Sequence, residues 1–390
     1  MGHVVVRAAE GEDERARLER ILQESFGTDD LPWTLWMERI GHPNLRVLVE
    51  DGVIRGGYGF YRFGQYWGGR SVPMMGLAGV GVTPAARGRG LAKRFLVDGL
   101  AELRAEGVPL AGLYASSLSV YRSVGFEAAG TLLRMAAPIA SLPAGDTALA
   151  CEPFAADDVG PLRALYEARA RSWNGHLDRS EAIWSRIGKP HKGVTRAYRF
   201  GPESAPEGYV IYMHASDEGS LHFGLTLRDL VLATPAAARR CCALLSGLRS
   251  LATEVRWLGC ASDPLVSLLP EETSKVHEHH RWMLRILDPA RALSARGYAS
   301  DGEAHLDVRD ALFGDVGLVV QVRSGRAEVE CTPAGRAPAR IDVRALAALY
   351  SGFAHPSALR AAGLVEGDER QVAALATLFS AHEPWLCDWF

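Results

Sequence analysis

The chain has 390 residues, of which 48% are hydrophobic and 23% are charged, and its formal net charge is −3. These values are typical of a globular protein with roughly two to three domains, and they exclude the strongly basic surface that nucleic-acid binding requires. No apolar run of about 18 residues occurs, and no apolar segment follows a basic start. We therefore expect a cytoplasmic protein without a membrane partner.

Residues 80–100 carry the pattern of a short strand that leads through a turn into a helix. The sequence Val80-Gly-Val-Thr-Pro-Ala-Ala-Arg-Gly-Arg-Gly90 is followed by helical apolar spacing from Leu91 to Leu100. Backbone N–H groups and the positive end of the helix dipole would then face one small volume, which favours a bound phosphate. The glycines match neither a P-loop nor a dinucleotide-binding fingerprint. An ordinary glycine-rich turn is the alternative interpretation.

Residues 110–126 predict a second strand followed by a short helix. Residues 110–116 are apolar enough for a buried strand, and residues 117–126 favour a helix with Gly125 in the C-cap position. Tyr121 lies within this helix, and the pattern Tyr-x-x-x-Gly-Phe ends at Phe126.

A faint self-similarity indicates two copies of one fold. Residues 36–43 recur at 184–190, residues 57–62 at 208–213 and residues 83–90 at 234–241, at offsets of 147 to 151 residues. The second copy has Arg239, Arg240 and Cys241 where the first has its Arg-Gly loop, and their Cβ atoms would obstruct close approach of a phosphate. We expect only the first copy to bind a cofactor. Chance similarity is the alternative.

The potential metal ligands do not form a recognisable metal site. The six cysteines contain no Cys-x-x-Cys pair, which suggests neither a zinc site nor a disulfide framework. His277-Glu-His-His280 has no partner cysteine and no spaced His-x-x-x-His, so we interpret it as a solvated loop and assign no metal.

The last hundred residues predict a small α+β domain. Residues 316–323 and 327–331 alternate like strands around the turn at Ser324 and Gly325, and residues 341–350 and 371–379 have helical spacing. The sequence ends on the aromatic tail Pro384-Trp-Leu-Cys-Asp-Trp-Phe390.

The Arg87-Gly-Arg-Gly90 loop and the Tyr121 motif resemble those of the GCN5-related N-acetyltransferases (GNAT). The order of two such copies, a third domain and the Phe390 end resembles the enhanced-intracellular-survival (Eis) family of bacterial acetyltransferases. This resemblance implies a mixed α+β fold with an active GNAT domain over residues 1–143, a degenerate GNAT domain over 144–287 and a sterol-carrier-like domain over 288–390. It also implies a hexamer.

The same resemblance implies roles for individual residues. Acetyl-CoA, the acyl donor, would be held by Val80, Gly81, Val82, Arg87, Gly88, Arg89, Gly90, Leu91, Ala92, Lys93, Ser116 and Ser117. Tyr121 falls where the family places its general acid, and the α-carboxylate of Phe390 falls where it places its proton acceptor. The backbone N–H groups of Gly81 and Val82 are candidates for polarising the thioester carbonyl.

These roles are chemically compatible with acetyl transfer to an amine. A phenol with a reference pKa near 10 can protonate a departing thiolate. A carboxylate has a reference pKa of about 3.3 to 3.7, so it needs burial among the tail aromatics to act as a base, or else attracts the substrate ammonium and passes the proton through water. Without the resemblance, a Trp-Phe ending indicates a tail packed on a core.

The acceptor amine is less constrained. Asp29, Asp30, Trp33 and Trp36 match the region that lines the family's amine cavity, although a solvated loop with two core tryptophans is the alternative. We predict direct acetyl transfer in a ternary complex to primary amines of the aminoglycoside, lysine or polyamine type. The competing hypotheses are an acetyltransferase specific for a peptide or metabolite amine, and a non-catalytic lipid carrier with a CoA-sensing module.

Overall fold

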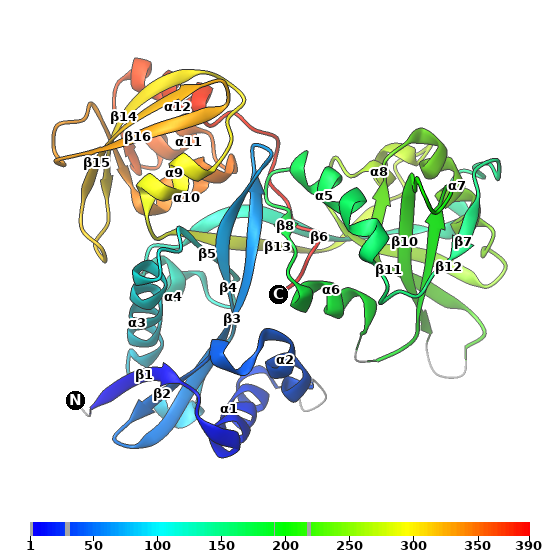
Figure 1. The fold of residues 1–390 in the computed structure, drawn as a ribbon, viewed down its shortest axis with the longest axis horizontal. Helices are drawn as coiled ribbons and strands as arrows, with labels where there is room; N and C mark the ends of the chain where they lie inside the picture. Colours follow the sequence, from blue (N-terminus) through cyan, green and yellow to red (C-terminus); the bar gives the residue numbers. More distant parts are fainter. Residues whose placement is uncertain (1–2, 28–31, 191, 217–219) are drawn as a thin grey trace. The chain divides into compact units, whose positions relative to one another are not determined.

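The computed structural model describes residues 3–27, 32–190, 192–216 and 220–390 (Figure 1). The chain divides into two compact units. The first is formed by residues 1–130, 281–384 and 390, and the second by residues 131–280 and 385–389. The mixed α+β class predicted from the sequence is confirmed. None of the described helices is long and apolar enough to cross a bilayer.

The first unit contains a sheet in the order β1-β2-β3-β4-β5-β13, in which only β4 and β5 run parallel. Its strands are β1 (Val4–Ala8), β2 (Leu45–Glu50), β3 (Val53–Trp67), β4 (Arg70–Val82), β5 (Leu110–Tyr114) and the last residues of β13 (Lys275–Ile286). Its helices are α1 (Gly11–Phe26), α2 (Trp33–Ile40), α3 (Leu91–Ala105) and α4 (Leu118–Arg122).

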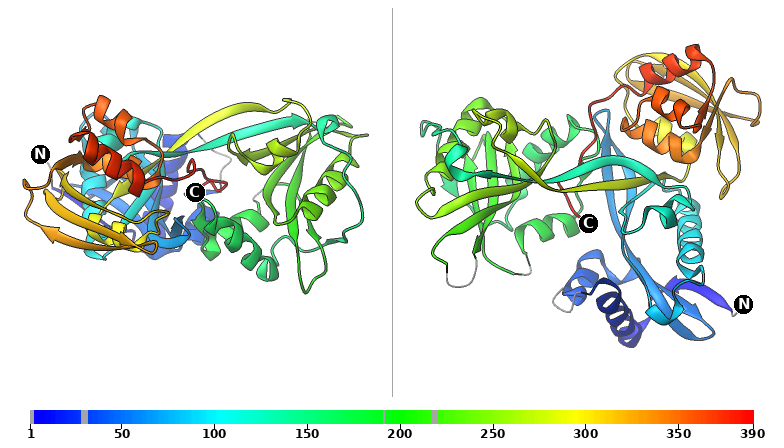
Figure 2. Two further views of the ribbon diagram at one scale, coloured as in Figure 1. Left: turned by 90° about the horizontal axis from the view of Figure 1, so that it is seen from above. Right: turned by 180° about the vertical axis from the view of Figure 1, so that it is seen from behind.

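Helices cover both faces of this sheet. Figure 2 shows α1 and α2, in dark blue, on one side of β3 and β4 and α3, in cyan, on the other. Neighbouring residues of β3 face opposite sides of the sheet and suit the two helices. Gly57 leaves room for Leu18 of α1, whereas Tyr58 packs against Phe95 of α3. Both faces are therefore closed, and the ends of the strands remain as the place for a ligand.

A five-stranded sheet in the order β16-β15-β14-β17-β18 completes the first unit. Its elements are α9 (Pro289–Ala295), β14 (Gly302–Arg309), β15 (Val316–Arg323), β16 (Arg326–Thr332), β17 (Ala339–Asp342), α10 (Val343–Ser351), α11 (Pro356–Ala361), β18 (Val365–Glu366) and α12 (Glu369–Leu378). The two strands predicted around Ser324 and Gly325 are present. The helix predicted from residue 341 begins at Val343, because Ile341 pairs with Val308 and the Asp342 side chain caps the helix.

A buried ion pair joins the two sheets of the first unit. Arg285 on β13 is fully buried and donates to Asp310 after β14 at 2.6 Å. The other Asp310 oxygen accepts the backbone N–H groups of Leu312 and Phe313. The carboxylate is therefore the counter-charge of a guanidinium that has no access to water.

The second unit repeats the pattern with a sheet in the order β13-β6-β12-β11-β10-β9-β7. Its elements are most of β6 (Glu127–Pro138), β7 (Cys151–Pro153), α5 (Arg163–Arg171), β8 (Leu177–Asp178), α6 (Glu181–Gly188), β9 (Thr195–Phe200), β10 (Gly208–Ser216), β11 (Phe223–Leu232), α7 (Pro235–Ser246), β12 (Ala252–Gly259), α8 (Pro264–Leu268) and the start of β13.

The loop predicted at His277 to His280 was wrong, because these residues form the exposed start of strand β13. Glu278 is paired there with Arg134 of β6 and with His280. Within the described chain no group of His, Cys, Asp and Glu side chains has the geometry to hold a metal ion.

We predict that Asp310→Ala destabilises the protein by about 3–5 kcal/mol, because it leaves the Arg285 guanidinium buried without a counter-charge. Urea unfolding followed by circular dichroism measures this free energy. Glu303→Ala is the matched control, because Glu303 is half-exposed where it pairs with His305 and should contribute less than about 1 kcal/mol. Equal effects of the two substitutions would contradict the structural role of Asp310.

Candidate functional site

The parallel strands β4 and β5 of the first unit pair over a short stretch and then separate. Met74, Met75 and Gly76 pair with Leu110, Ala111 and Gly112, after which β4 continues to Val82 and β5 to Tyr114 without pairing to each other. Backbone groups of both strands therefore face an opening at the ends of the strands. Polar backbone groups of this kind need a hydrogen-bonding partner.

A β-bulge in β4 sets the direction of these backbone groups. Gly59 pairs with Ala78 but Gly57 pairs with Gly81, so β4 has one extra residue, and Gly79 within the bulge has φ +63°. The N–H of Thr83 bonds to Arg55 in β3. Because an antiparallel ladder alternates, the N–H and C=O of Val82 point away from β3, whereas Gly81 pairs with it. Of the two backbone N–H groups predicted to polarise the thioester carbonyl, those of Gly81 and Val82, the geometry therefore favours the N–H of Val82.

The predicted phosphate loop connects β4 to α3 and has the geometry that the glycines require. Gly88 and Gly90 have φ +75° and +77°, and an added Cβ at either position would meet no atom within 4 Å. Gly90 is the N-cap of α3 and offers no side chain, so the N–H groups of Leu91, Ala92 and Lys93 have no cap. Open donors, positive φ and an exposed loop fit a diphosphate.

The basic side chains of this loop differ in their contacts. Arg87 is exposed and donates through Nε to the carbonyl oxygen of Val82 at 3.2 Å. Arg89 is held by both oxygens of Glu50, at 2.5 and 3.0 Å. Lys93 is exposed and has no ion pair within the residues that the structure describes. Arg87 and Lys93 are therefore the cations available to a phosphate, whereas Arg89 must first leave Glu50.

Tyr121 lies on α4, directly beyond the end of β5. Gly125 ends this segment with φ +89°, as predicted, and a Cβ there would lie 2.8 Å from the Arg285 guanidinium. Tyr121 is buried against Phe126, and burial raises the pKa of its phenol to about 12. Its hydroxyl has no hydrogen bond within the described chain. Ser116 and Ser117 are exposed between β5 and α4, with Ser117 Oγ 3.3 Å from Ser119 Oγ.

Phe390 packs at the point where β4 and β5 separate. Its ring lies 4.9 Å from that of Phe63 and 5.3 Å from that of Tyr114, the last residue of β5. A Cβ at Gly76, the last residue of β4 that pairs with β5, would lie 2.6 Å from the Phe63 ring and 2.7 Å from the Phe390 ring. The absence of a side chain at Gly76 therefore makes room for both rings, and Phe390 is 8% exposed.

The predicted aromatic residues of α2 continue this wall. Trp33 contacts Trp36 at 5.4 Å, and Trp36 contacts Tyr61, whose ring lies 6.4 Å from that of Phe390. Both indoles also pack against Gly79 of the bulge. Asp29 and Asp30 lie outside the described residues.

Sequence reasoning missed three members of this wall, namely Tyr61, Phe63 and Tyr114. The alternating aromatic residues of β3 were a usable signal, because Tyr61 and Phe63 fall on the same face of a strand. The sequence gives no such signal for Tyr114, because only the contact with Phe390 shows that the Tyr114 ring lines the opening.

The second unit keeps the separated strands but not the loop. β11 pairs with β12 over residues 223–226 and then continues to Leu232 paired only with β10, with a bulge opposite Ile211 and Tyr212. Here α7 begins at Pro235 with Thr234 as its cap, so Arg239 to Cys241 lie inside the helix. The sequence predicts that Cβ atoms obstruct a phosphate loop here, whereas in the structure these residues form part of helix α7 and no such loop is present.

A buried charge cluster holds the aromatic tail in the second unit. Arg179 is fully buried and pairs with Asp229 at 2.6 Å and with Asp388 at 2.9 Å. Its guanidinium lies 3.6 Å from the ring centre of Tyr166, whose hydroxyl lies within hydrogen-bonding distance of Asp388. Tyr209 donates to Asp229, and the Arg179 charge keeps the pKa of Asp229 low although burial alone would raise it.

Comparison with known proteins agrees with this geometry. Family models described as acetyltransferase (GNAT) domain match residues 6–129 and 175–286, and a model described as sterol carrier protein domain matches residues 289–387. The fold and the site thus define an acyltransferase with two GNAT domains and a sterol-carrier-like domain, as predicted.

Relatives extend over most of the chain. An uncharacterized N-acetyltransferase of Streptomyces avermitilis is 32% identical over 355 residues, 83% of this chain and 82% of that one. Solved GCN5-related N-acetyltransferases from Anabaena variabilis (29% identity, TM-score 0.94) and Kribbella flavida (28%, 0.85) cover 100% of this chain and 100% and 99% of theirs. The chain belongs to the GNAT N-acetyltransferases, and its fold is Eis-like, since Eis1 of Mycobacterium abscessus matches it over 100% of both chains (23%, 0.80).

We predict that Gly76→Ala lowers kcat by roughly 10- to 100-fold, because the new methyl group displaces Phe390 from the opening. The dissociation constant of acetyl-CoA should change little, because the phosphate loop is untouched. Steady-state kinetics and calorimetry measure the two quantities.

Gly112→Ala is the matched control for this substitution. Gly112 is the pairing partner of Gly76, and a Cβ there meets only the flexible end of Met74, at 3.1 Å, and a backbone oxygen at 3.5 Å. The control should keep kcat within about twofold. Equal losses in the two variants would show that strand packing, and not Phe390, limits the rate.

Proposed function

We propose that the protein transfers acetyl groups from acetyl-CoA to primary amines directly, in a ternary complex, with Tyr121 as general acid and the Phe390 α-carboxylate as proton acceptor. The observation that carries this proposal is the position of Phe390 at the separation of β4 and β5. That opening is where the unpaired backbone of a GNAT domain would meet a thioester.

The binding of the donor follows from the loop. The uncapped N–H groups at the start of α3 and the free cations Arg87 and Lys93 suit the diphosphate of acetyl-CoA. The Val82 N–H, aimed into the opening, is placed to polarise the thioester carbonyl as negative charge develops on its oxygen. Ser116 and Ser117 at the end of β5 would contact the other side of the donor.

Tyr121 is suited to protonating the thiolate that leaves. With its pKa raised to about 12, the phenol is protonated throughout the neutral range. Since its hydroxyl has no partner among the described residues, its proton is available to the departing sulfur. Cys241 and Cys242 of α7 are buried and Cys387 of the tail is partly buried, and burial raises the pKa of Cys387 to about 12, which disfavours an acyl-cysteine intermediate at these positions.

The Phe390 carboxylate is suited to attracting the substrate amine and accepting its proton. The rings of Tyr61, Phe63 and Tyr114 surround the Phe390 side chain, so its carboxylate would act beside an aromatic wall. Aromatic faces together with a carboxylate also attract a cation. We therefore assign the acceptor to amines that are cationic in solution, of the aminoglycoside, lysine or polyamine type, with Trp33 and Trp36 on the wall of their site.

We predict that Tyr121→Phe lowers kcat by about 10²-fold and leaves KM for acetyl-CoA within about twofold, because only the proton donor is removed. Release of free CoA, followed with a thiol reagent, measures both constants. An unchanged kcat would exclude Tyr121 as the general acid.

We predict that adding two or three residues after Phe390 abolishes turnover while acetyl-CoA still binds, because the carboxylate is replaced by a neutral peptide group. Intact mass establishes that the parent protein ends at Phe390, and calorimetry measures donor binding. Unimpaired turnover in the extended protein would rule out the terminal carboxylate. A carrier without catalysis would show no CoA release with aminoglycosides, polyamines or lysine peptides in either protein.

A further inference from the structure

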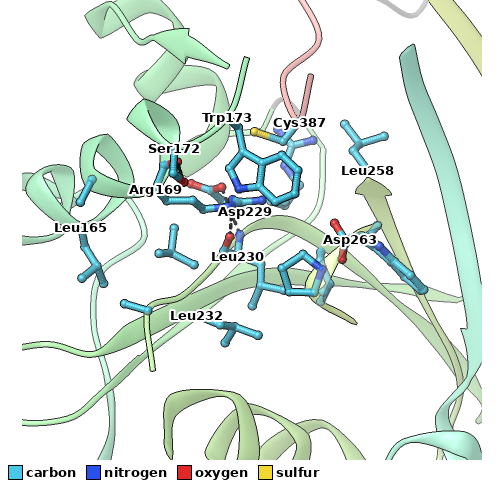
Figure 3. A pocket seen from close by; sticks show the side chains of 17 residues that line it. Leu165, Arg169, Ser172, Trp173, Asp229, Leu230, Leu232, Leu258, Asp263 and Cys387 are labelled. Atoms are coloured by element: carbon cyan, nitrogen blue, oxygen red, sulfur yellow. Dashed lines mark hydrogen bonds between the residues drawn. The ribbon is translucent and has the colours of Figure 1, made fainter. Parts of the chain in front are cut away.

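The second unit contains a cavity of about 360 Å³ that the proposed acetyl transfer does not use (Figure 3). Its volume lies at the lower end of the roughly 300–1,000 Å³ that small-molecule sites span. Most of its wall is apolar. It comes from α5, from the part of β11 beyond its pairing with β12, and from the start of α8, and its lining side chains include Trp173 and Trp257.

The cavity lies where the strands of the second unit separate. Its floor includes residues 227–233, which continue β11 beyond its pairing with β12, and its side includes Trp257 and Leu258 at the end of β12. This is the topological equivalent of the opening between β4 and β5 in the first unit. The fold has therefore kept a cleft for an elongated ligand while α7 has replaced the phosphate loop.

One cation in this cavity forms no direct ion pair within the described chain, although the charges of Asp263 and Asp229 act on it from a longer distance. Arg169, in the last turn of α5, donates to the carbonyl oxygen of Leu230 at 2.6 Å, and its guanidinium lies 5.4 Å from the ring centre of Trp385. No carboxylate lies within 4 Å of its nitrogens among the described residues. A guanidinium has five N–H donors, so most of them remain available.

The neighbouring carboxylates are already engaged. Asp229 accepts from Arg179, Tyr209 and the Leu230 N–H, which uses both of its oxygens. Asp263, whose pKa burial raises to about 6, accepts the N–H of Leu265. Figure 3 shows Arg169 beside Asp229 and Asp263 on the opposite wall. Neither carboxylate forms a direct ion pair with Arg169 among the described residues, so the guanidinium can still take a ligand carboxylate as its contact partner.

We propose that this cavity binds a small carboxylic acid with an apolar body, whose carboxylate pairs with Arg169 and whose body lies against Trp173 and the leucines of β11. A planar guanidinium matches a carboxylate in a bidentate pair. The leucines of β11 exclude water from the apolar part of the ligand, and this burial contributes hydrophobic binding energy. CoA itself is not the ligand, because the uncapped helix start that would hold its diphosphate is absent here.

Calorimetric titration of the full chain with octanoate tests this site. We expect saturable binding of octanoate below its micelle concentration, and at least tenfold weaker binding of octylamine, which carries the opposite charge, and of acetate, which lacks the body. No saturable heat with octanoate, or equal affinity for octylamine, would overturn the proposal.

Two variants localise the binding. Arg169→Met should weaken octanoate about tenfold or more, whereas Arg171→Met, on the same helix with its side chain 55% exposed, should leave it unchanged. Ala168→Trp, at an exposed position that lines the cavity, should block binding without disturbing the core. Circular dichroism checks that each variant is folded. Octanoate affinity unchanged in both Arg169→Met and Ala168→Trp would overturn the assignment.

Discussion

The separation of two parallel strands after three residue pairs is the constraint on which the rest of this protein depends. Once β4 and β5 part beyond Gly76 and Gly112, their polar backbone loses its ladder partners, and a chemical group must take their place. The bulge at Gly79 sets the direction of the backbone, the loop before α3 leaves the first N–H groups of the helix uncapped, and Phe390 packs in the opening. Each of these features has a physical role only because the strands separate.

The duplicated cleft shows that strand separation alone does not define a nucleotide site. In both units the two parallel strands separate. Only in the first unit do two glycines with positive φ, Gly88 and Gly90, precede a helix whose first N–H groups have no side-chain cap. Such a start lacks the capping bonds that stabilise a helix, which a bound anion can replace. In the second unit Thr234 caps α7 and Asp229 and Arg169 bond the Leu230 backbone. In the second unit, side chains therefore bond the backbone groups that a thioester would contact in the first unit.

Local patterns predicted the parts of the fold and site that are formed locally. The glycine loop, the helix around Tyr121 and the hairpin at Gly325 are each encoded within about twenty residues, and each was found. Non-local features could not be predicted from local patterns: Arg179 and Asp388 are 209 residues apart in sequence, and Tyr114 and Phe390 are likewise distant in sequence. The loop predicted at His277 failed because residues 275–279 of the strand are all exposed and so show no alternation of polarity, and only pairing within the sheet shows that they form a strand.

The cluster around Arg179 explains how residues 385–389 are held within the second unit. Burying a guanidinium with two carboxylates contributes little net stability, but removing one partner is costly, so such clusters favour one arrangement over its neighbours. Asp388 is the second carboxylate on the Arg179 guanidinium, and Cys387 Sγ also lies 3.7 Å from it, so a shift of the tail by one residue would remove a counter-charge from the buried cation. The register of residue 388 within the second unit is therefore set electrostatically.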